Sequence, residues 1–276
     1  MKSATRRVRD LHKRLLVKPG AKVDLSDFDP SDTMHVGDKD EAKHQLEVDA
    51  EAIDVLQDRL YAEGKRALLI ILQGMDTSGK DGTVRAVFSR TGPMGIAVTA
   101  FKKPSEVELA HDFLWRIHRA TPQRGTIGIF NRSQYEDVLI GRVRSLASAE
   151  VIEHRYDQIN AFEDMISSST RIVKFMLHIS KEEQGVRLQA RLDEPHKNWK
   201  FEPGDVAERK LWGDYMEAYE KMLQRCSTKV APWYVIPSNK KWARNAAIAT
   251  IVRATLEDMY PRYPTPDWDP ASFTIE

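Results

Sequence analysis

The sequence contains one cysteine, Cys226, and no long apolar run. A single cysteine cannot form an intrachain disulfide, and neither an N-terminal apolar signal segment nor a run of about 18 apolar residues is present. The pattern therefore predicts a cytoplasmic protein with no membrane partner. The chain also lacks an excess of one charge, with 42 Lys+Arg against 41 Asp+Glu. This balance excludes a generally basic nucleic-acid binder, so any site for a polyanion must be local.

The length of 276 residues fits one large α/β domain with a terminal arm. We expect residues 1–40 to form a basic N-terminal arm with a turn-rich lead-in, laid over the body. The alternative for the arm is a solvated helix with no ligand. Residues 41–262 are expected to form the main domain, and the Pro-rich residues 263–276 an extended tail. The basic residues of the arm are Lys2, Arg6, Arg7, Arg9, Lys13, Arg14 and Lys18, against one acid, Asp10.

Five short apolar runs alternate with longer amphipathic segments. We expect strands at residues 67–72, 96–101, 126–130, 172–179 and 233–236. Helical spacing predicts helices at residues 41–61, 80–89, 105–119, 133–143, 149–166, 181–192, 207–223 and 242–259. Strands that are apolar on both faces and separated by helices predict an α/β fold in which a five-stranded parallel sheet lies between two helical layers.

A glycine-rich loop joins the first expected strand to the helix that follows it. Its sequence is Gly74-Met75-Asp76-Thr77-Ser78-Gly79-Lys80, which matches a P-loop in the structural context that the motif requires. Glycines let successive backbone N–H groups face inward, the helix adds its positive N-terminal end, and Lys80 supplies a charge to a phosphate chain. The residues expected to contact phosphates are Gly74, Thr77, Ser78, Gly79, Lys80, Asp81 and Gly82.

The loop departs from the usual P-loop pattern at one position. Asp81 stands where a Ser or Thr normally binds magnesium, so the metal must be held differently. Asp76 is the replacement that we expect, because a carboxylate among inward-facing N–H groups and phosphates needs a cation or an acceptor hydroxyl beside it. A solvent-facing Asp76 with no ligand is the alternative.

A second polar cluster follows the third expected strand. In an open α/β sheet the ligand crevice lies at the carboxyl ends of the strands, so this cluster should reach the glycine-rich loop. Asp137 could hold a hydrated Mg²⁺, and Arg132 could neutralise charge on a transferring phosphoryl group. Ser133 and Glu136 have the spacing of a helix capping box. Asn131 and Glu136 complete the expected substrate contacts.

Two further sets of basic residues are candidates for anion binding. Lys102 and Lys103 follow the second expected strand, where at least one could face the crevice, although a solvated pair is the alternative. Arg187 and Arg191 are four residues apart and share one helix face. We expect the segment of about residues 181–210 to form a lid whose arginines close over substrate.

Together these motifs resemble the polyphosphate kinase 2 family. The resemblance rests on residues 74–82, Phe101-Lys102-Lys103-Pro104-Ser105, residues 130–139 and Trp199-Lys200-Phe201. It implies a P-loop kinase fold of the thymidylate-kinase type with a helical lid. It also implies that residues 41–262 transfer a terminal phosphoryl group between inorganic polyphosphate and a nucleotide, with Mg²⁺ or Mn²⁺.

The resemblance also implies roles for individual residues. Asp76 would orient the nucleotide acceptor and the metal, Lys80 would contact the phosphates, and Asp137 would be the Walker-B-type acid. Arg132, Arg187 and Arg191 would be transition-state or polyphosphate clamps, with Lys102 and Lys103 along the polyphosphate channel. The acceptors would be adenine nucleotides. The resemblance leaves open whether AMP, ADP or both are used, and whether guanine nucleotides are also accepted. A homodimer or homotetramer is implied.

An ATP-dependent nucleoside monophosphate kinase is the second interpretation, because the spacing Gly-x-Asp-x-x-Gly-Lys is also similar to that of thymidylate kinases. Lys102, Lys103 and the basic arm favour polyphosphate, since an ATP donor would not need an extended positive track. A non-enzymatic nucleotide-sensing module is the third interpretation, and it leaves the cluster around Arg132 and Asp137 unexplained.

Overall fold

The computed structural model describes residues 2–275 and contains one five-stranded, fully parallel sheet with the strand order β2-β3-β1-β4-β5. The predicted fold class and the number of strands are therefore confirmed. The central position of β1 places the loop that follows it between the ends of β3 and β4. The strands are β1 (Ala67–Gln73), β2 (Ile96–Ala100), β3 (Ile127–Asn131), β4 (Thr170–His178) and β5 (Trp233–Pro237).

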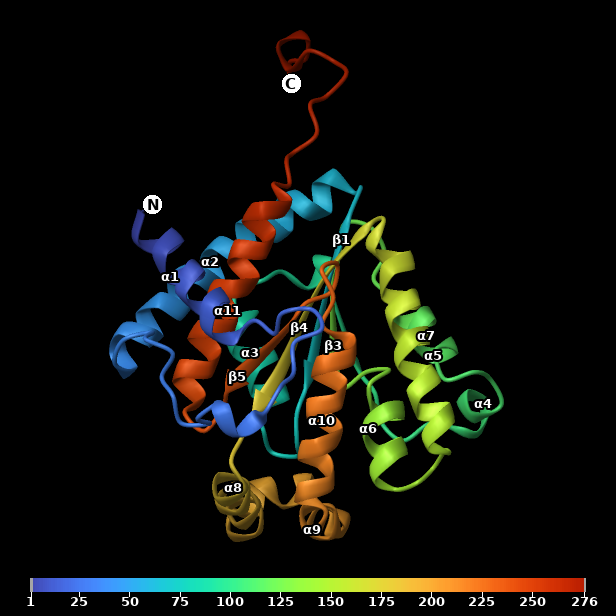
Figure 1. Cartoon of the computed structure of the whole chain (residues 1–276). Helices are drawn as coiled ribbons and strands as arrows, with labels where there is room; N and C mark the ends of the chain where they lie inside the picture. The colour runs from blue at the N-terminus through green and yellow to red at the C-terminus, as the bar shows by residue number, and fades with distance from the viewer. Residues whose placement is uncertain (1, 276) are drawn as a thin grey trace.

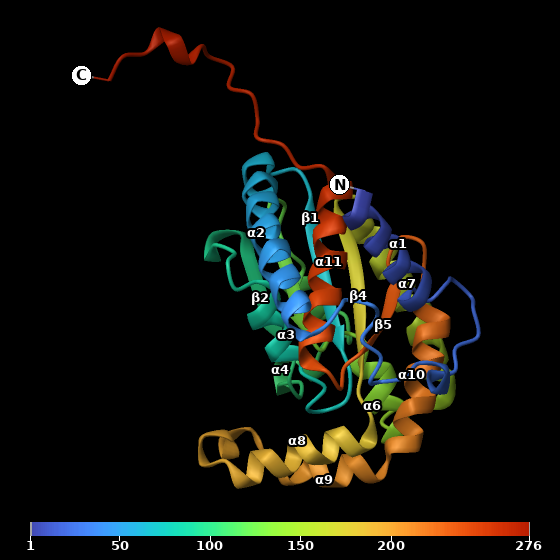
Figure 2. The ribbon, with the colours of Figure 1, turned by 90° about the vertical axis from the view of Figure 1, so that its left-hand side faces the viewer.

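Helices cover both faces of the sheet and form the two outer layers (Figure 1). One layer contains α1 (Lys2–Leu15), α2 (Lys39–Glu63), α3 (Lys80–Val87) and α11 (Lys241–Met259). The other contains α5 (Trp115–Ala120), α6 (Glu136–Val143), α7 (Ala149–Ser167) and α10 (Trp212–Cys226). The short helix α4 (Glu106–Leu109) precedes α5. Figure 2 shows α8 (Lys181–Asp193) and α9 (Pro203–Lys210) projecting together at one end of the body, as expected for a lid.

The central strand explains why both faces must be covered. Every residue of β1 is buried, and its apolar side chains alternate between two cores. Leu69 and Ile71 belong to the core under α7 and α10, whereas Leu68, Ile70 and Leu72 belong to the core under α2 and α11. Such runs are typical of a parallel strand that has no solvent-facing side.

Three predicted helices differ from the observed ones. The expected helix 105–119 is two helices, α4 and α5, because the Asp112 side chain accepts the Leu114 backbone N–H at 2.9 Å and stabilises a turn between them. The expected helix 207–223 is broken at Leu211, between α9 and α10. Helix α6 begins at Glu136, so the predicted capping box is wrong: the Ser133 hydroxyl accepts instead from Gln73 Nε2 at 3.2 Å.

The two terminal segments differ in how they meet the body. Helix α1 packs on α11 and β5, and its Leu11 and Leu15 side chains are buried. Tyr263 donates a hydrogen bond to Asp58 of α2 at 2.6 Å, and residues 264–275 extend away from the body (Figure 2). No helix among the described residues is both long and apolar enough to cross a bilayer.

Candidate functional site

The glycine-rich loop between β1 and α3 has the backbone geometry of a phosphate cradle. Gly74 has φ of +149°, and a Cβ atom there would lie 2.7 Å from the carbonyl oxygen of Leu177 in the neighbouring strand β4. Gly79 has φ of +108°. Thr77 also has a positive φ, +63°, which is unfavourable for a β-branched residue. The conformation is therefore imposed by the surroundings of the loop.

Lys80 lies inside this loop. Its side chain is buried, and Nζ donates to the carbonyl oxygens of Gly74 at 2.8 Å and Met75 at 3.2 Å. Burial, followed by the positive charge of Arg132, lowers the pKa of Lys80 to about 8. An ammonium group in this position can exchange a carbonyl partner for a phosphate oxygen with little movement.

Asp76 and Arg132 form the central ion pair of the site. Arg132 Nη2 donates to Asp76 Oδ1 at 2.5 Å. Burial opposes the ionised form of Asp76, but the positive charges of Arg132, Lys80 and Arg191 outweigh it and hold the pKa of the carboxyl below its ordinary value. The carboxylate predicted from the loop is thus ionised and surrounded by cations.

Arg132 reaches the loop because the chain turns sharply after β3. Its φ is +63°, a left-handed conformation that non-glycine residues adopt rarely. The preceding residue, Asn131, donates from Nδ2 to Asp81 Oδ1 at 2.6 Å. Asp81, which replaces the usual metal-binding Ser or Thr, is therefore connected to the end of β3.

Glu136 and Asp137, both expected in the site, have different neighbours in the structure. Glu136 is among the charges that act on Lys80 and Arg132. Asp137 lies beside Arg155, whose Nη1 is 3.9 Å from Asp137 Oδ1 and donates to its backbone carbonyl at 3.1 Å. Successive helical residues point about 100° apart, which explains why the two carboxylates meet different partners. The metal role expected for Asp137 stays a prediction.

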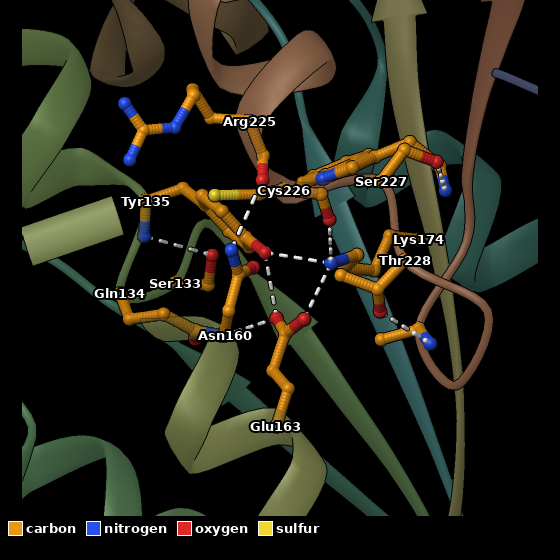
Figure 3. Close-up of polar contacts among 12 residues, drawn as sticks. Ser133, Gln134, Tyr135, Asn160, Glu163, Lys174, Arg225, Cys226, Ser227 and Thr228 are labelled. Atoms are coloured by element: carbon orange, nitrogen blue, oxygen red, sulfur yellow. Dashed lines mark hydrogen bonds and ion pairs between the residues drawn. The ribbon is translucent and has the colours of Figure 1, made fainter. Parts of the chain in front are cut away.

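A buried polar network holds the turn that carries Arg132 (Figure 3). Lys174 of β4 donates to Glu163 of α7 at 2.5 Å, to the Tyr135 hydroxyl at 2.7 Å and to the Cys226 carbonyl at 2.8 Å. Glu163 also accepts from the Tyr135 hydroxyl at 2.7 Å and from Gln134 Nε2 at 3.0 Å. Gln134 and Tyr135, which follow Arg132 and Ser133 in the sequence, thus bond to the fully buried Lys174–Glu163 ion pair.

The two arginines of the expected lid have different partners. Arg187 donates to the backbone carbonyls of Thr77 and Ser78 at 2.9 and 3.2 Å, so it joins α8 to the loop. Arg191 donates to Asp205 at 3.1 Å, and its charge acts on Asp76. The roles expected for the two arginines as clamps on the substrate stay predictions.

Lys102 and Lys103 are exposed at the carboxyl end of β2. They line an open cleft of about 680 Å³ together with Arg116 and Arg119. The Phe101 backbone N–H donates to the Asn131 carbonyl at 3.0 Å, so this cleft starts beside the end of β3. The lysines therefore lie near the loop but outside the ion cluster around Asp76.

Sequence reasoning missed two residues of the site. Gln184 of α8 is buried and donates to the Asp76 carbonyl at 3.2 Å. Tyr219 of α10 is buried among the charges of Glu136, Arg132 and Asp76, and burial raises its pKa well above the ordinary value. Neither residue belongs to a motif, and in the sequence Tyr219 is simply one apolar position of an amphipathic helix. Only tertiary packing brings them to the loop.

Comparison with known proteins agrees with this geometry. The family model described as Polyphosphate kinase 2 matches residues 36–264. The chain is 47% identical to an AMP/ADP-polyphosphate phosphotransferase of Meiothermus ruber over 266 residues, which cover 96% of this chain and 100% of that protein. It is 42% identical to an ADP-polyphosphate phosphotransferase of Rhodopseudomonas palustris, with 91% and 92% of the two chains covered.

The same relationship holds for solved structures. The crystal structure of Polyphosphate Kinase 2 from Arthrobacter aurescens superposes with a TM-score of 0.89 and is 43% identical, covering 93% of this chain and 95% of that chain. These likenesses extend over nearly the whole chain. They do not favour the ATP-dependent monophosphate kinase. The chain therefore belongs to the polyphosphate kinase 2 family and is a polyphosphate:nucleotide phosphotransferase.

Proposed function

We propose that this chain transfers the terminal phosphoryl group between inorganic polyphosphate and adenine nucleotides, and that it accepts both AMP and ADP. The observation that carries the acceptor range is the 47% identity, over the full length of the relative, to an AMP/ADP-polyphosphate phosphotransferase. Guanine nucleotides remain a second acceptor class to be tested. The relative of Rhodopseudomonas palustris is named for ADP alone, so the acceptor range must be measured for each member.

The arrangement of charges suits phosphoryl transfer without a covalent nucleophile. Phosphoryl transfer depends on positioning and on neutralising charge at the transferring group. We assign Lys80 and the loop N–H groups to binding the phosphate chain, and Arg132 to the transferring group. Asp76 keeps Arg132 in place through their ion pair of 2.5 Å and remains an acceptor for the metal or the nucleotide.

The donor atoms of the site fit Mg²⁺ or Mn²⁺. Among the described residues no group of three or more His, Cys, Asp or Glu side chains could hold a metal, so substrate phosphates must supply most of the ligands. This is the usual arrangement for Mg²⁺ in kinases. Asp76 and Asp137 would be the protein ligands, and Glu136 lies among the charges that act on Lys80 and Arg132. The bound cation would neutralise phosphate charge while the protein side chains orient the two substrates.

We assign the cleft beside β2 to the polyphosphate chain. Lys102 and Lys103 are exposed there, and Arg119 adds a positive charge, whereas the buried Arg116 lies 3.8 Å from Glu108 in the same cleft. A nucleoside triphosphate donor would not need positive charges this far from the phosphate loop. In this assignment the lid helices α8 and α9 close over the loop, with Arg191 as the arginine available to substrate.

The acceptor range is tested by product analysis. Purified protein is incubated with Mg²⁺ and long-chain polyphosphate, and with AMP, ADP, GMP or GDP in separate reactions. We expect ADP and ATP from AMP, and ATP from ADP. Turnover of ADP with no product from AMP would reject the monophosphate half of the proposal. The homodimer or homotetramer and the cytoplasmic location remain predictions, which sedimentation and localisation experiments can test.

A further inference from the structure

Arg244 on α11 is a buried cation without a carboxylate partner. Its side chain is 1% exposed, and among the residues that the structure describes no acid forms an ion pair with it. Nη1 donates to the Ser78 carbonyl at 2.8 Å, while Nε and Nη2 donate to Asn245 Oδ1 at 3.0 and 2.8 Å. A buried guanidinium is costly unless its charge is compensated.

Arg187, on lid helix α8, approaches the same segment from another element. Its Nη1 lies 3.2 Å from the Ser78 carbonyl that Arg244 also contacts, and 2.9 Å from the Thr77 carbonyl. Glu183 compensates the charge of Arg187, because its Oε1 accepts a hydrogen bond from Arg187 Nε at 2.8 Å. Arg244 has no such neighbour, so burial and the charge of Arg187 lower the pKa of Arg244 to about 9.

A third cation adds to this group. Lys241 lies one turn before Arg244 on α11, and burial followed by the charges of Arg187 and Arg244 lowers its pKa. Three positive side chains therefore gather behind the phosphate loop, with one carboxylate in direct contact with one of them. The free protein carries an excess of positive charge at this point.

The geometry connects this excess to the phosphate side of the loop. A peptide unit whose carbonyl is bonded behind the loop has its N–H oriented toward the opposite side, where phosphate oxygens bind. A guanidinium at the Ser78 carbonyl both fixes that peptide plane and increases the polarity of its N–H. Arg244 thus acts on the phosphate through the Ser78–Gly79 peptide.

The size of residue 79 makes this contact possible. A Cβ atom on Gly79 would lie 1.8 Å from Arg244 Nη1. The absence of a side chain at Gly79 therefore serves two purposes, because it permits the φ of +108° and leaves space for the guanidinium.

We propose that Arg244 is a positioning residue of the phosphate loop, which fixes the Ser78–Gly79 peptide and supplies a buried positive charge that the phosphates of bound polyphosphate or nucleotide compensate. The inference rests on the proposed phosphoryl-transfer function and extends it to a residue outside every phosphate-binding motif. Arg187 acts with Arg244 by bonding the same carbonyl from the lid, which links the loop to α8.

The experiment compares Arg244→Met and Arg244→Lys with Arg253→Met. Arg253 is a matched control because it lies on the same helix and binds Asp49 and Glu257, away from the loop. The first readout is calorimetric binding of sodium tripolyphosphate without nucleotide, and the second is kcat and KM for polyphosphate and ADP. Thermal unfolding with and without tripolyphosphate separates binding from stability of the free protein.

We expect Arg244→Met to weaken tripolyphosphate binding by about 10-fold or more, because the variant loses both the bond that fixes the Ser78–Gly79 peptide and the buried positive charge. The stabilisation by tripolyphosphate should shrink, whereas Arg253→Met should change only the stability of the free protein. Arg244→Lys should bind with intermediate affinity, because one ammonium group retains the charge but cannot span Ser78 and Asn245.

Wild-type affinity in folded Arg244→Met would overturn the inference. If Arg244→Met does not fold, Arg244→Lys decides, and wild-type binding and kcat/KM in that variant would contradict a positioning role for the guanidinium. Because binding is measured without turnover, failure of this inference is distinguishable from failure of the proposed acceptor range.

Discussion

Asp76 is the residue on which the chemistry depends most directly. It is an ionised carboxylate within 2.5 Å of Arg132, in a loop whose other groups attract phosphate. Asp76→Asn keeps the shape but removes the charge that a metal or acceptor needs, so we expect kcat to fall by about 100-fold or more with little change in the unfolding temperature. Asp164→Asn, on the exposed surface of α7, is the control. Near wild-type turnover by folded Asp76→Asn would remove Asp76 from the mechanism.

Lys80 gives a second test at the same scale. Its ammonium group is a predicted phosphate contact that also bonds two loop carbonyls, those of Gly74 and Met75. Lys80→Ala should therefore lose most turnover and raise the KM for polyphosphate, while circular dichroism shows the helical content of the wild type. An unchanged KM would mean that the lysine supports the loop without contacting the donor.

Individual residues were predictable where a motif carries them. Asp76, Lys80 and Arg132 were identified from the loop and from the end of the third strand, and the structure brings all three together. The metal role expected for Asp137 and the substrate contact expected for Glu136 stay predictions, because the sequence does not reveal how a helix is rotated about its axis. Arg244 was missed because a buried arginine in a helix has no pattern of its own.

At the scale of elements, the turn after β3 depends on the buried Lys174–Glu163 pair. Glu163→Gln leaves the Lys174 charge uncompensated in the core, and removing one partner of such a pair costs about 3–5 kcal/mol of unfolding free energy. Adding Lys174→Met should recover part of this loss, since no buried charge then remains. Urea denaturation measures both variants. A double variant less stable than Glu163→Gln would contradict this account of the anchor.

Strand β4 ends in a buried histidine that makes stability depend on pH. Burial lowers the pKa of His178 below 6.5, so the unfolded chain binds its proton more readily than the folded one. The folded state should therefore lose stability as pH falls through about 6.5, and not as pH rises. Unfolding free energies at about pH 7.5 and pH 5.5 should differ less in His178→Gln than in the wild type or in exposed His44→Gln. Equal differences in all three would contradict this role of His178.

The elements themselves were largely predictable. Apolar runs between amphipathic segments located all five strands, because a parallel strand with two buried faces leaves a clear signal. The helix expected at residues 105–119 was wrong because the Asp112 turn competes locally with helix formation. The break at Leu211 has no comparable local signal. It separates the lid from the body, so tertiary arrangement determines it.

At the scale of the whole molecule, the site is assembled from segments far apart in the sequence. The turn after β3, helix α8 and helix α11 each donate hydrogen bonds to the loop after β1. Parallel topology predicts that the first two meet, since both follow the carboxyl ends of adjacent strands. Contacts from α8 and α11 depend on how the helical layers pack, which periodicity does not encode.

The central claim, that inorganic polyphosphate is the phosphoryl donor, is tested most directly by exchanging donors. Purified protein with Mg²⁺ and AMP or ADP receives either long-chain polyphosphate or ATP, and nucleotide products are quantified over time. We predict that polyphosphate yields ADP from AMP and ATP from ADP. Phosphoryl transfer to AMP from ATP, with no product from polyphosphate under the same conditions, would contradict the claim and leave Lys102 and Lys103 without a function.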